Sequence, residues 1–298
     1  MSQAQKQSFI TKQILTKEEL TAIKELTDIC NRHENLHMRI SWDMLQSRPG
    51  VEINDFLFYT DNQLVGYLYI DSWGIEEKEL TGMVHPDYRR RGIFRQLFNA
   101  SKEECESRGA ERLLLICERS SSSGQAWIKS LDAEHDFSEH EMVLENFQES
   151  MVFDDRLIFR PADSGDLDLL VTIRVGSFGD TTEDVRPNIE KHLQDPSQHY
   201  YVATLGGADI GCKEPVGSLR LDEGAESIGI YGFGVLPEYR RRGYGRQMLE
   251  EVIHTIRAKS QKPIMLDVDV DNTPALALYR SCGFQIKTTY DYYKIDLK

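Results

Sequence analysis

The sequence predicts an α/β protein built from two tandem copies of one mixed-sheet fold. The chain has 298 residues, about twice the usual domain length of roughly 150. Residues 84–98 (VHPDYRRRGIFRQLF) recur as residues 235–249 (VLPEYRRRGYGRQML), with nine of fifteen positions identical. A repeat at an offset of 151 residues is domain-sized and indicates a duplicated fold. Strand-like and helix-like segments also alternate in both copies, which is typical of α/β architecture.

The first copy is expected to span residues 1–153, with a boundary near 150–156. Apolar residues three apart predict a helix at its start, and Asp61-Asn62 favours a turn between two strands. The expected elements are a helix over 17–32, strands over 56–60 and 64–70, a strand ending at 84, a helix over 95–108 and a strand over 112–117. The polar stretch S-S-S-S-G-Q that follows predicts a loop.

The second copy, residues 154–298, repeats this order. Its expected elements are a strand near 157–160, a helix over 166–175, strands over 200–205, 215–221 and 228–235, a helix over 246–259, a strand over 264–270 and a short helix over 274–282. For the last helix we expect Thr273 as N-cap, Pro274 at its first position and Gly283 just past its end.

Charge and composition limit the classes of function. The chain has 35 basic and 49 acidic residues, a net charge of −14, and both halves are acidic. This balance argues against a nucleic-acid or anionic-membrane binder and favours a small cationic or amine substrate. We find no signal peptide and no run of about 18 apolar residues, so we expect a cytoplasmic protein. Five scattered cysteines without a C-x-x-C spacing indicate reduced thiols and no zinc site.

The segment Arg240–Gly245 carries the strongest chemical signal. It reads R-R-R-G-Y-G between a strand ending at Val235 and a helix. Glycines let backbone N–H groups approach an anion closely, and the following helix adds its positive N-terminal end. A lone G-x-G is weak, and three arginines alone are usually a solvated face. Because strand, loop and helix occur in order and recur, we interpret the loop as a phosphate seat.

The segment V-L-P-E-Y-R-R-R-G-Y-G-R-Q-M-L resembles the acyl-CoA motif of the GNAT N-acyltransferases, Arg/Gln-x-x-Gly-x-Gly/Ala, filled by Arg240, Gly243 and Gly245. Downstream, D-N-T-P-A-L-A-L-Y-R-S-C-G-F resembles the second motif of that family and includes Asn272 and Tyr279. The tandem layout, with a better-preserved second copy, is similar to that of mycothiol synthase. This last likeness concerns layout alone.

The resemblance implies two tandem GNAT folds and assigns roles in the second copy. Strand 228–235 would splay from strand 264–270, the pantetheine arm would pair with the exposed backbone, and Tyr279 would protonate the departing thiolate. The residues implied to bind the acyl-CoA are Phe233, Gly234, Val235, Arg240, Arg241, Arg242, Gly243, Tyr244, Gly245, Arg246 and Asn272. The alternative for Tyr279 is a core aromatic on an amphipathic helix, and for Asn272 a local cap.

Both copies depart from the family pattern at some positions. Many relatives carry a glutamate as general base six residues before the position of Val235, where this chain has Gly229. Tyr231 and Glu226 are nearby but do not match, so no base is assigned. In the first copy Phe94 replaces the second glycine, and the fixed offset sets Ser121 opposite Asn272 and Ile128 opposite Tyr279. We therefore expect a degenerate first copy that shapes the acceptor cleft.

The resulting expectation is an acetyl-CoA-dependent N-acetyltransferase. Its acceptor would be the primary amine of a small molecule, an amino-acid derivative or a peptide N-terminus. The alternative is an acyl-CoA sensor or scaffold without turnover, and a nucleic-acid binder is the weakest hypothesis. We assign no metal, because His33 and His37 lack an obvious third ligand. The protein is expected to be a monomer or homodimer.

Overall fold

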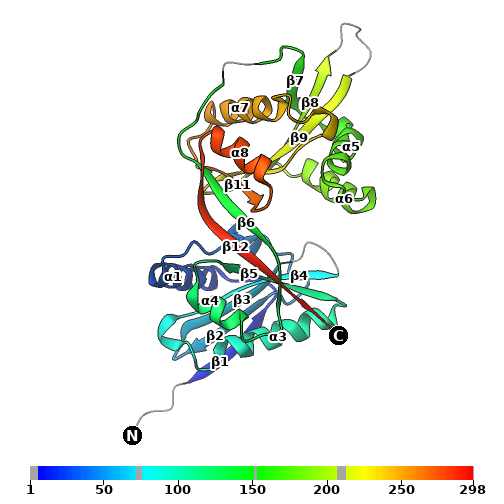
Figure 1. Cartoon of the computed structure of the whole chain (residues 1–298). Helices are drawn as coiled ribbons and strands as arrows, with labels where there is room; N and C mark the ends of the chain where they lie inside the picture. Colours follow the sequence, from blue (N-terminus) through cyan, green and yellow to red (C-terminus); the bar gives the residue numbers. More distant parts are fainter. Residues whose placement is uncertain (1–5, 72–75, 151–152, 207–212, 298) are drawn as a thin grey trace. The chain divides into compact units, whose positions relative to one another are not determined.

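The chain folds into two compact units that each combine helices with a mixed sheet. The computed structural model describes residues 6–71, 76–150, 153–206 and 213–297. One unit comprises Met1–Glu139 with Thr288–Lys298, and the other His140–Lys287. Strands β6 (Glu134–Leu144) and β12 (Phe284–Asp296) contribute residues to both units. The predicted α/β class is confirmed (Figure 1).

The first unit arranges its strands in the order β1-β2-β3-β4-β5-β12. The β4–β5 pair is parallel, and the other neighbours are antiparallel. The strands before β6 are β1 (Gln7–Lys12), β2 (Asp55–Thr60), β3 (Gln63–Asp71), β4 (Glu77–Val84) and β5 (Arg112–Glu118). The helices are α1 (Lys17–Glu34), α2 (Trp42–Gln46), α3 (Ile93–Ser107) and α4 (Ser122–Ile128).

Two separate apolar clusters cover the sheet of this unit. Ile23 and Leu26 of α1 pack with Tyr67 in one cluster, whereas Ile93 and Leu97 of α3 belong to the other. The helices therefore lie on opposite faces, because alternate residues of a strand point to opposite sides.

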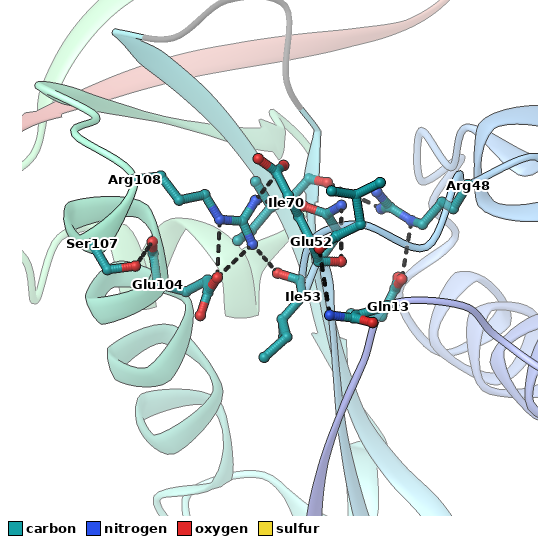
Figure 2. Close-up of polar contacts among 11 residues, drawn as sticks. Gln13, Arg48, Glu52, Ile53, Ile70, Glu104, Ser107 and Arg108 are labelled. Atoms are coloured by element: carbon teal, nitrogen blue, oxygen red, sulfur yellow. Dashed lines mark hydrogen bonds and ion pairs between the residues drawn. The ribbon is translucent and has the colours of Figure 1, made fainter.

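The end of α3 is held by a polar cluster on one arginine. Arg108 bonds the carboxylates of Glu104 and Glu52, each at 2.9 Å, and the carbonyl of Ile53 (Figure 2). The ion pairs contribute little by themselves when exposed, but together they fix the helix end to the strand that follows residue 54.

The second unit has the strand order β7-β8-β9-β10-β11-β6, read from one edge inward. Its strands before β12 are β7 (Leu157–Pro161), β8 (Gln198–Gly206), β9 (Lys213–Glu223), β10 (Ile228–Val235) and β11 (Ile264–Asp269). Its helices are α5 (Leu167–Phe178), α6 (Thr182–Leu193), α7 (Tyr244–Arg257) and α8 (Thr273–Ser281). The main cluster joins Leu249 and Val252 of α7 to Ile230 and Leu266 of the strands.

Strand β10 changes partners along its length. Its parallel pairing with β11 covers Ile228, Gly229 and Ile230 and ends at Ile230. Against β9 the register shifts between Tyr231 and Gly234, a β-bulge. Gly232 within the bulge has φ +55°, a conformation that favours glycine. Bulges re-aim side chains and are frequent beside active sites.

Two local expectations were wrong. The stretch S-S-S-S-G-Q is not a loop: Ser121 caps α4 by accepting a hydrogen bond from the Gly124 N–H at 3.1 Å. Trp127 and Ile128 then pack this short helix on the core. In α8 the N-cap is Asn272 rather than Thr273. By contrast, the predicted turn at Asp61-Asn62 does join β2 to β3.

Candidate active site

The loop before α7 has the backbone shape that an anion seat requires. Arg241 has φ +59° and Gly243 has φ +88°, and helix α7 starts at the next residue, Tyr244. Gly243 is the N-cap and offers no side chain to the first N–H groups of the helix. These donors therefore stay available, with the positive end of the helix dipole behind them.

Four arginines lie in this loop or in the first turn of α7, and they divide into two kinds. Arg240 donates from Nε to the carbonyl of Val235 and from Nη2 to the carbonyl of Ser177, each at 2.9 Å. Arg246 is bound to Glu250 at 2.5 Å and to the Ser281 hydroxyl at 2.8 Å. These two side chains brace the loop.

Arg241 and Arg242 are exposed, and the guanidinium of Arg242 stacks 5.6 Å from the ring of Tyr239. They are the two arginines of the group best placed to meet an anion from solvent.

Gly245 and Phe233 bring α7, β10 and α8 together. A Cβ at Gly245 would lie 3.5 Å from side-chain atoms of Val235 and Leu278, and 3.9 Å from Cζ of Phe233. Because nothing else approaches more closely, the surface here is bare backbone with an aromatic floor. A substrate chain can lie close to the helix at this point.

Tyr279 lies on α8 beside that floor. It is buried, and its ring centre is 6.2 Å from that of Phe233 and 6.1 Å from that of Phe284. Burial, and then the nearby Cys282 thiol, raise the pKa of Tyr279 well above its ordinary value. Asn272 caps the same helix by accepting from the Ala275 N–H at 3.2 Å. The structure thus brings Phe233, Gly245 and Tyr279 together, whereas Asn272 has a local role.

Tyr244 has a structural position. Its ring is buried, and its hydroxyl donates to Asp154 at 3.0 Å. Burial raises the pKa of this phenol, and the carboxylate adds to the shift.

The family is decided by sequence. The model of the Acetyltransferase (GNAT) family matches residues 21–129 and again 167–284, more than half of the chain. The chain belongs to the GNAT family. The predicted tandem of two GNAT folds is thereby confirmed, and so is the prediction of an acyltransferase at the level of the family.

Similar proteins match one or both copies of the chain. A mycothiol acetyltransferase of Acidothermus cellulolyticus is 25% identical over 282 residues, covering 86% of this chain and 82% of that protein. The N-alpha-acetyltransferase RimI of Mycobacterium tuberculosis is 36% identical over 108 residues, which are 36% of this chain and 65% of RimI. A GCN5-related N-acetyltransferase of Sphaerobacter thermophilus matches in fold with a TM-score of 0.80 and 20% identity, over 97% of this chain and 95% of its own.

In the second GNAT copy, Tyr231 fills the place of the missing glutamate. A Cβ at Gly229 would lie 2.3 Å from Cε2 and 2.9 Å from the hydroxyl oxygen of Tyr231. The guanidinium of Arg220 stacks 5.0 Å from the centre of the same ring. No larger side chain fits at position 229 unless Tyr231 moves. In the sequence Tyr231 is close to position 229 along the chain, but no pattern indicates that its ring lies over Gly229.

The first GNAT copy keeps the loop but not its surroundings. Arg90 has φ +63° and Gly92 has φ +81°, close to the values in the second copy. Phe94 meets Trp127 edge to face at 4.4 Å, where the second copy has bare backbone. A largely apolar cavity of about 650 Å³ lies beside this loop, between β4, β5 and α4.

Glu34 contacts three of the residues that line that cavity. Its carboxylate is paired with Arg89 and accepts from the Ser121 hydroxyl and the Ser123 N–H, each at 3.2 Å. Burial would raise the pKa of Glu34, but the hydrogen bonds from Ser123 and the charge of Arg89 lower it to about 2. An ionised carboxylate therefore lies at the start of α4, where Ser121 corresponds to Asn272 of the second copy. The sequence alone gave no sign of it.

Other sites are not seen in the part of the chain that the structure covers. Over that part, no group of three metal-ligating side chains gathers and no helix is long and apolar enough to cross a membrane. The four described cysteines, Cys30, Cys105, Cys117 and Cys282, are buried and free. The fifth cysteine, Cys212, lies outside the described residues.

Proposed function

We propose that this chain transfers the acetyl group of acetyl-CoA to a primary amine, and that the second copy, residues 154–298, performs the transfer. The observation that carries the proposal is the contact of Phe233, Gly245 and Tyr279 beside the uncapped start of α7. Relatives named as an N-alpha-acetyltransferase and a mycothiol acetyltransferase support an acetyl donor and an amine acceptor. The acceptor is a small molecule, an amino-acid derivative or a peptide N-terminus.

The residues of the loop suit a pyrophosphate. The N–H groups from Arg241 to Gly245 and the start of α7 would receive it, with Arg241 and Arg242 supplying charge. Arg240 and Arg246 would hold the loop in shape. The bare surface at Gly245 leaves room for the pantetheine arm to pass between α7 and Phe233 toward the strand end at Gly234 and Val235.

The transfer itself needs no metal and no redox partner. The amine lone pair attacks the thioester carbon, a C–N bond forms, and the C–S bond breaks with its electron pair on sulfur. A backbone N–H near Val235 would stabilise the oxyanion. The nitrogen loses one proton and the sulfur gains one, so the protons balance. Tyr279 would donate a hydrogen bond, and then its proton, to the departing sulfur.

One observation favours the second candidate, an acyl-CoA sensor without turnover. Position 229 carries no carboxylate, and Tyr231 covers it. Release of free thiol from acetyl-CoA in the presence of a panel of amines separates the two candidates. An enzyme releases thiol with at least one amine at a rate that depends on chain concentration, whereas a sensor binds acetyl-CoA and releases none.

The assignment to the second copy has a matched test. Arg241 and Arg242 occupy the same loop positions as Arg90 and Arg91, and all four are exposed. Changing Arg241 and Arg242 to alanine should weaken acetyl-CoA binding at least tenfold, about 1.4 kcal/mol. Changing Arg90 and Arg91 should leave kcat nearly unchanged. The opposite pattern in two folded variants would move the catalytic site to the first copy.

A further inference from the structure

Ser177 is held in a fixed place at the end of β10. It is the second-last residue of α5, and its carbonyl accepts a hydrogen bond from Nη2 of Arg240 at 2.9 Å. The same guanidinium donates from Nε to the carbonyl of Val235 at 2.9 Å. One arginine side chain therefore ties the end of the helix to the end of the strand. The position of Ser177 against the strand is set by two directed bonds.

The side chain of Ser177 lies directly on the strand backbone. A Cβ at Gly234 would be 2.7 Å from Cβ and 2.9 Å from Oγ of Ser177. No other residue than glycine fits at 234 while the helix keeps this distance. The neighbours Phe233 and Val235 contact Gly245 of α7 instead. Successive strand residues point to opposite faces, so the Ser177 side chain meets the strand from the side away from α7.

The hydroxyl of Ser177 is a buried polar group at the end of α5. Its Oγ is shielded from solvent and makes no hydrogen bond to any residue that the structure describes. Buried hydroxyls are nearly always hydrogen-bonded, and an exception in a folded protein calls for an explanation such as a catalytic role. Here the exception lies against Gly234, between the two residues expected to border the thioester.

We propose that the Ser177 hydroxyl accepts a hydrogen bond from the acceptor amine and aims its lone pair at the thioester carbon. The inference rests on the proposed function. The donor would approach from the α7 side and the acceptor from the α5 side, where Ser177 lies. The amine nitrogen forms its bond to the carbonyl carbon as the C–S bond breaks. The proton that it loses balances the one that the sulfur gains. Ser177 orients the amine and is not itself acetylated.

Two other groups complete this side of the strand. Nη1 of Arg174 would be 3.5 Å from a Cβ at Gly232, and Tyr231 covers Gly229. Nε of Arg174 donates to Asp180 at 2.5 Å. The strand backbone from 229 to 234 thus has three glycines, and a polar side chain borders each of them.

The test is Ser177→Ala in the full chain, with initial rates measured against acceptor and donor separately. We expect kcat/KM for the acceptor to fall about tenfold while the Kd for acetyl-CoA changes less than twofold. The melting temperature should stay equal or rise, because alanine removes an unsatisfied polar group and favours the helix. Ser177→Cys keeps the shape of the side chain but is slightly larger and a weak acceptor, so its rate should also fall. Thr172→Ala, an exposed hydroxyl on α5 that bonds the carbonyl of Asp168, is the matched control.

Several results overturn the inference. A Ser177→Ala chain with wild-type acceptor kcat/KM removes Ser177 from the site. A loss of acetyl-CoA affinity equal to the loss of rate places the hydroxyl on the donor instead. A lower melting temperature with a proportional loss of activity makes its role structural. If the wild-type chain binds acetyl-CoA but turns over no amine, the proposed function fails, and this inference fails with it.

Discussion

Replacing Tyr279 by phenylalanine tests the proposed acid with the least disturbance of the fold. The change deletes one oxygen and keeps the ring that packs beside Phe233 and Phe284. No residue that the structure describes hydrogen-bonds this phenol, so none loses a partner. Stability should therefore change by less than about 1 kcal/mol, and the affinity for acetyl-CoA should be retained.

The expected loss of rate follows from the environment of the phenol. Burial raises the pKa of Tyr279, so the group stays protonated through the working pH range and can always donate. A hydrogen bond to a developing thiolate contributes roughly 1.5–3 kcal/mol, which corresponds to about 10- to 150-fold in kcat. General acid catalysis adds 10²-fold or more. We therefore expect kcat to fall roughly 10²-fold, with no alkaline loss of activity from Tyr279 below about pH 10.

The assay is steady-state release of thiol, with a pre-steady-state measurement to establish that chemistry limits the rate. Tyr201→Phe is the matched control, because Tyr201 is equally buried and its ring centre lies 5.3 Å from that of Phe159, on which it stacks. If Tyr279→Phe lowers kcat less than threefold while chemistry is rate-limiting, Tyr279 is a core residue. If Tyr201→Phe gives the same loss, the effect comes from packing.

Two further predictions rest on single positions. Gly245→Phe, which introduces the residue of the first copy, should weaken acetyl-CoA binding at least tenfold by calorimetry. Gly245→Ala fits its neighbours and should change the affinity less. Equal affinity in the Phe variant would mean that acetyl-CoA does not pass over this position. Glu34 has a pKa of about 2, so its contribution to stability is present above its unfolded value of 4.5 and is lost as pH falls toward 2. Glu34→Gln should thus be less stable than the parent chain at pH 7, by on the order of 2–3 kcal/mol, and the gap should narrow in urea unfolding at pH 3. A gap independent of pH would show that the charge of Glu34 does not matter.

The parts of the fold that local pattern controls were predictable. Strand β10 has the predicted bounds, Ile228–Val235, and α7 begins at Tyr244, two residues before the expected start. The signals used were local: apolar residues with the period of a strand, a loop that contains glycine, and apolar residues with the period of a helix. Such signals do not depend on distant parts of the chain. The helix α4 was missed for the opposite reason. Serines and glycine have weak helix propensity, and packing of Trp127 and Ile128 overrides it.

Features that depend on distant partners could not be read from the sequence. Arg240 was expected to meet phosphate, and in the structure its guanidinium bonds two backbone carbonyls, one of them from α5, sixty-three residues away. That Ser177 and Tyr231 lie against Gly234 and Gly229 depends on the bulge in β10 and on the end of α5. The strands β6 and β12 contribute to both units, and nothing in their local pattern says which core they serve. The binding roles of the loop residues, and the division at residue 153, remain predictions.

The two copies differ in the groups that bind their first loop arginine, Arg89 or Arg240. This difference accounts for the expectation that the second copy, and not the first, binds the acyl donor. Both arginines donate from Nε to the carbonyl that ends the preceding strand, Val84 or Val235. In the second copy the rest of the guanidinium bonds a neutral backbone carbonyl, so this arginine brings no carboxylate to the site. In the first copy it binds Glu34, which also takes the N–H at the start of α4. An internal carboxylate that stays ionised repels a phosphate chain and removes a donor that a ligand would use. The loop backbone is alike in both copies. The capacity of each loop to bind the phosphates of the acyl donor is therefore set by the residues that face the loop.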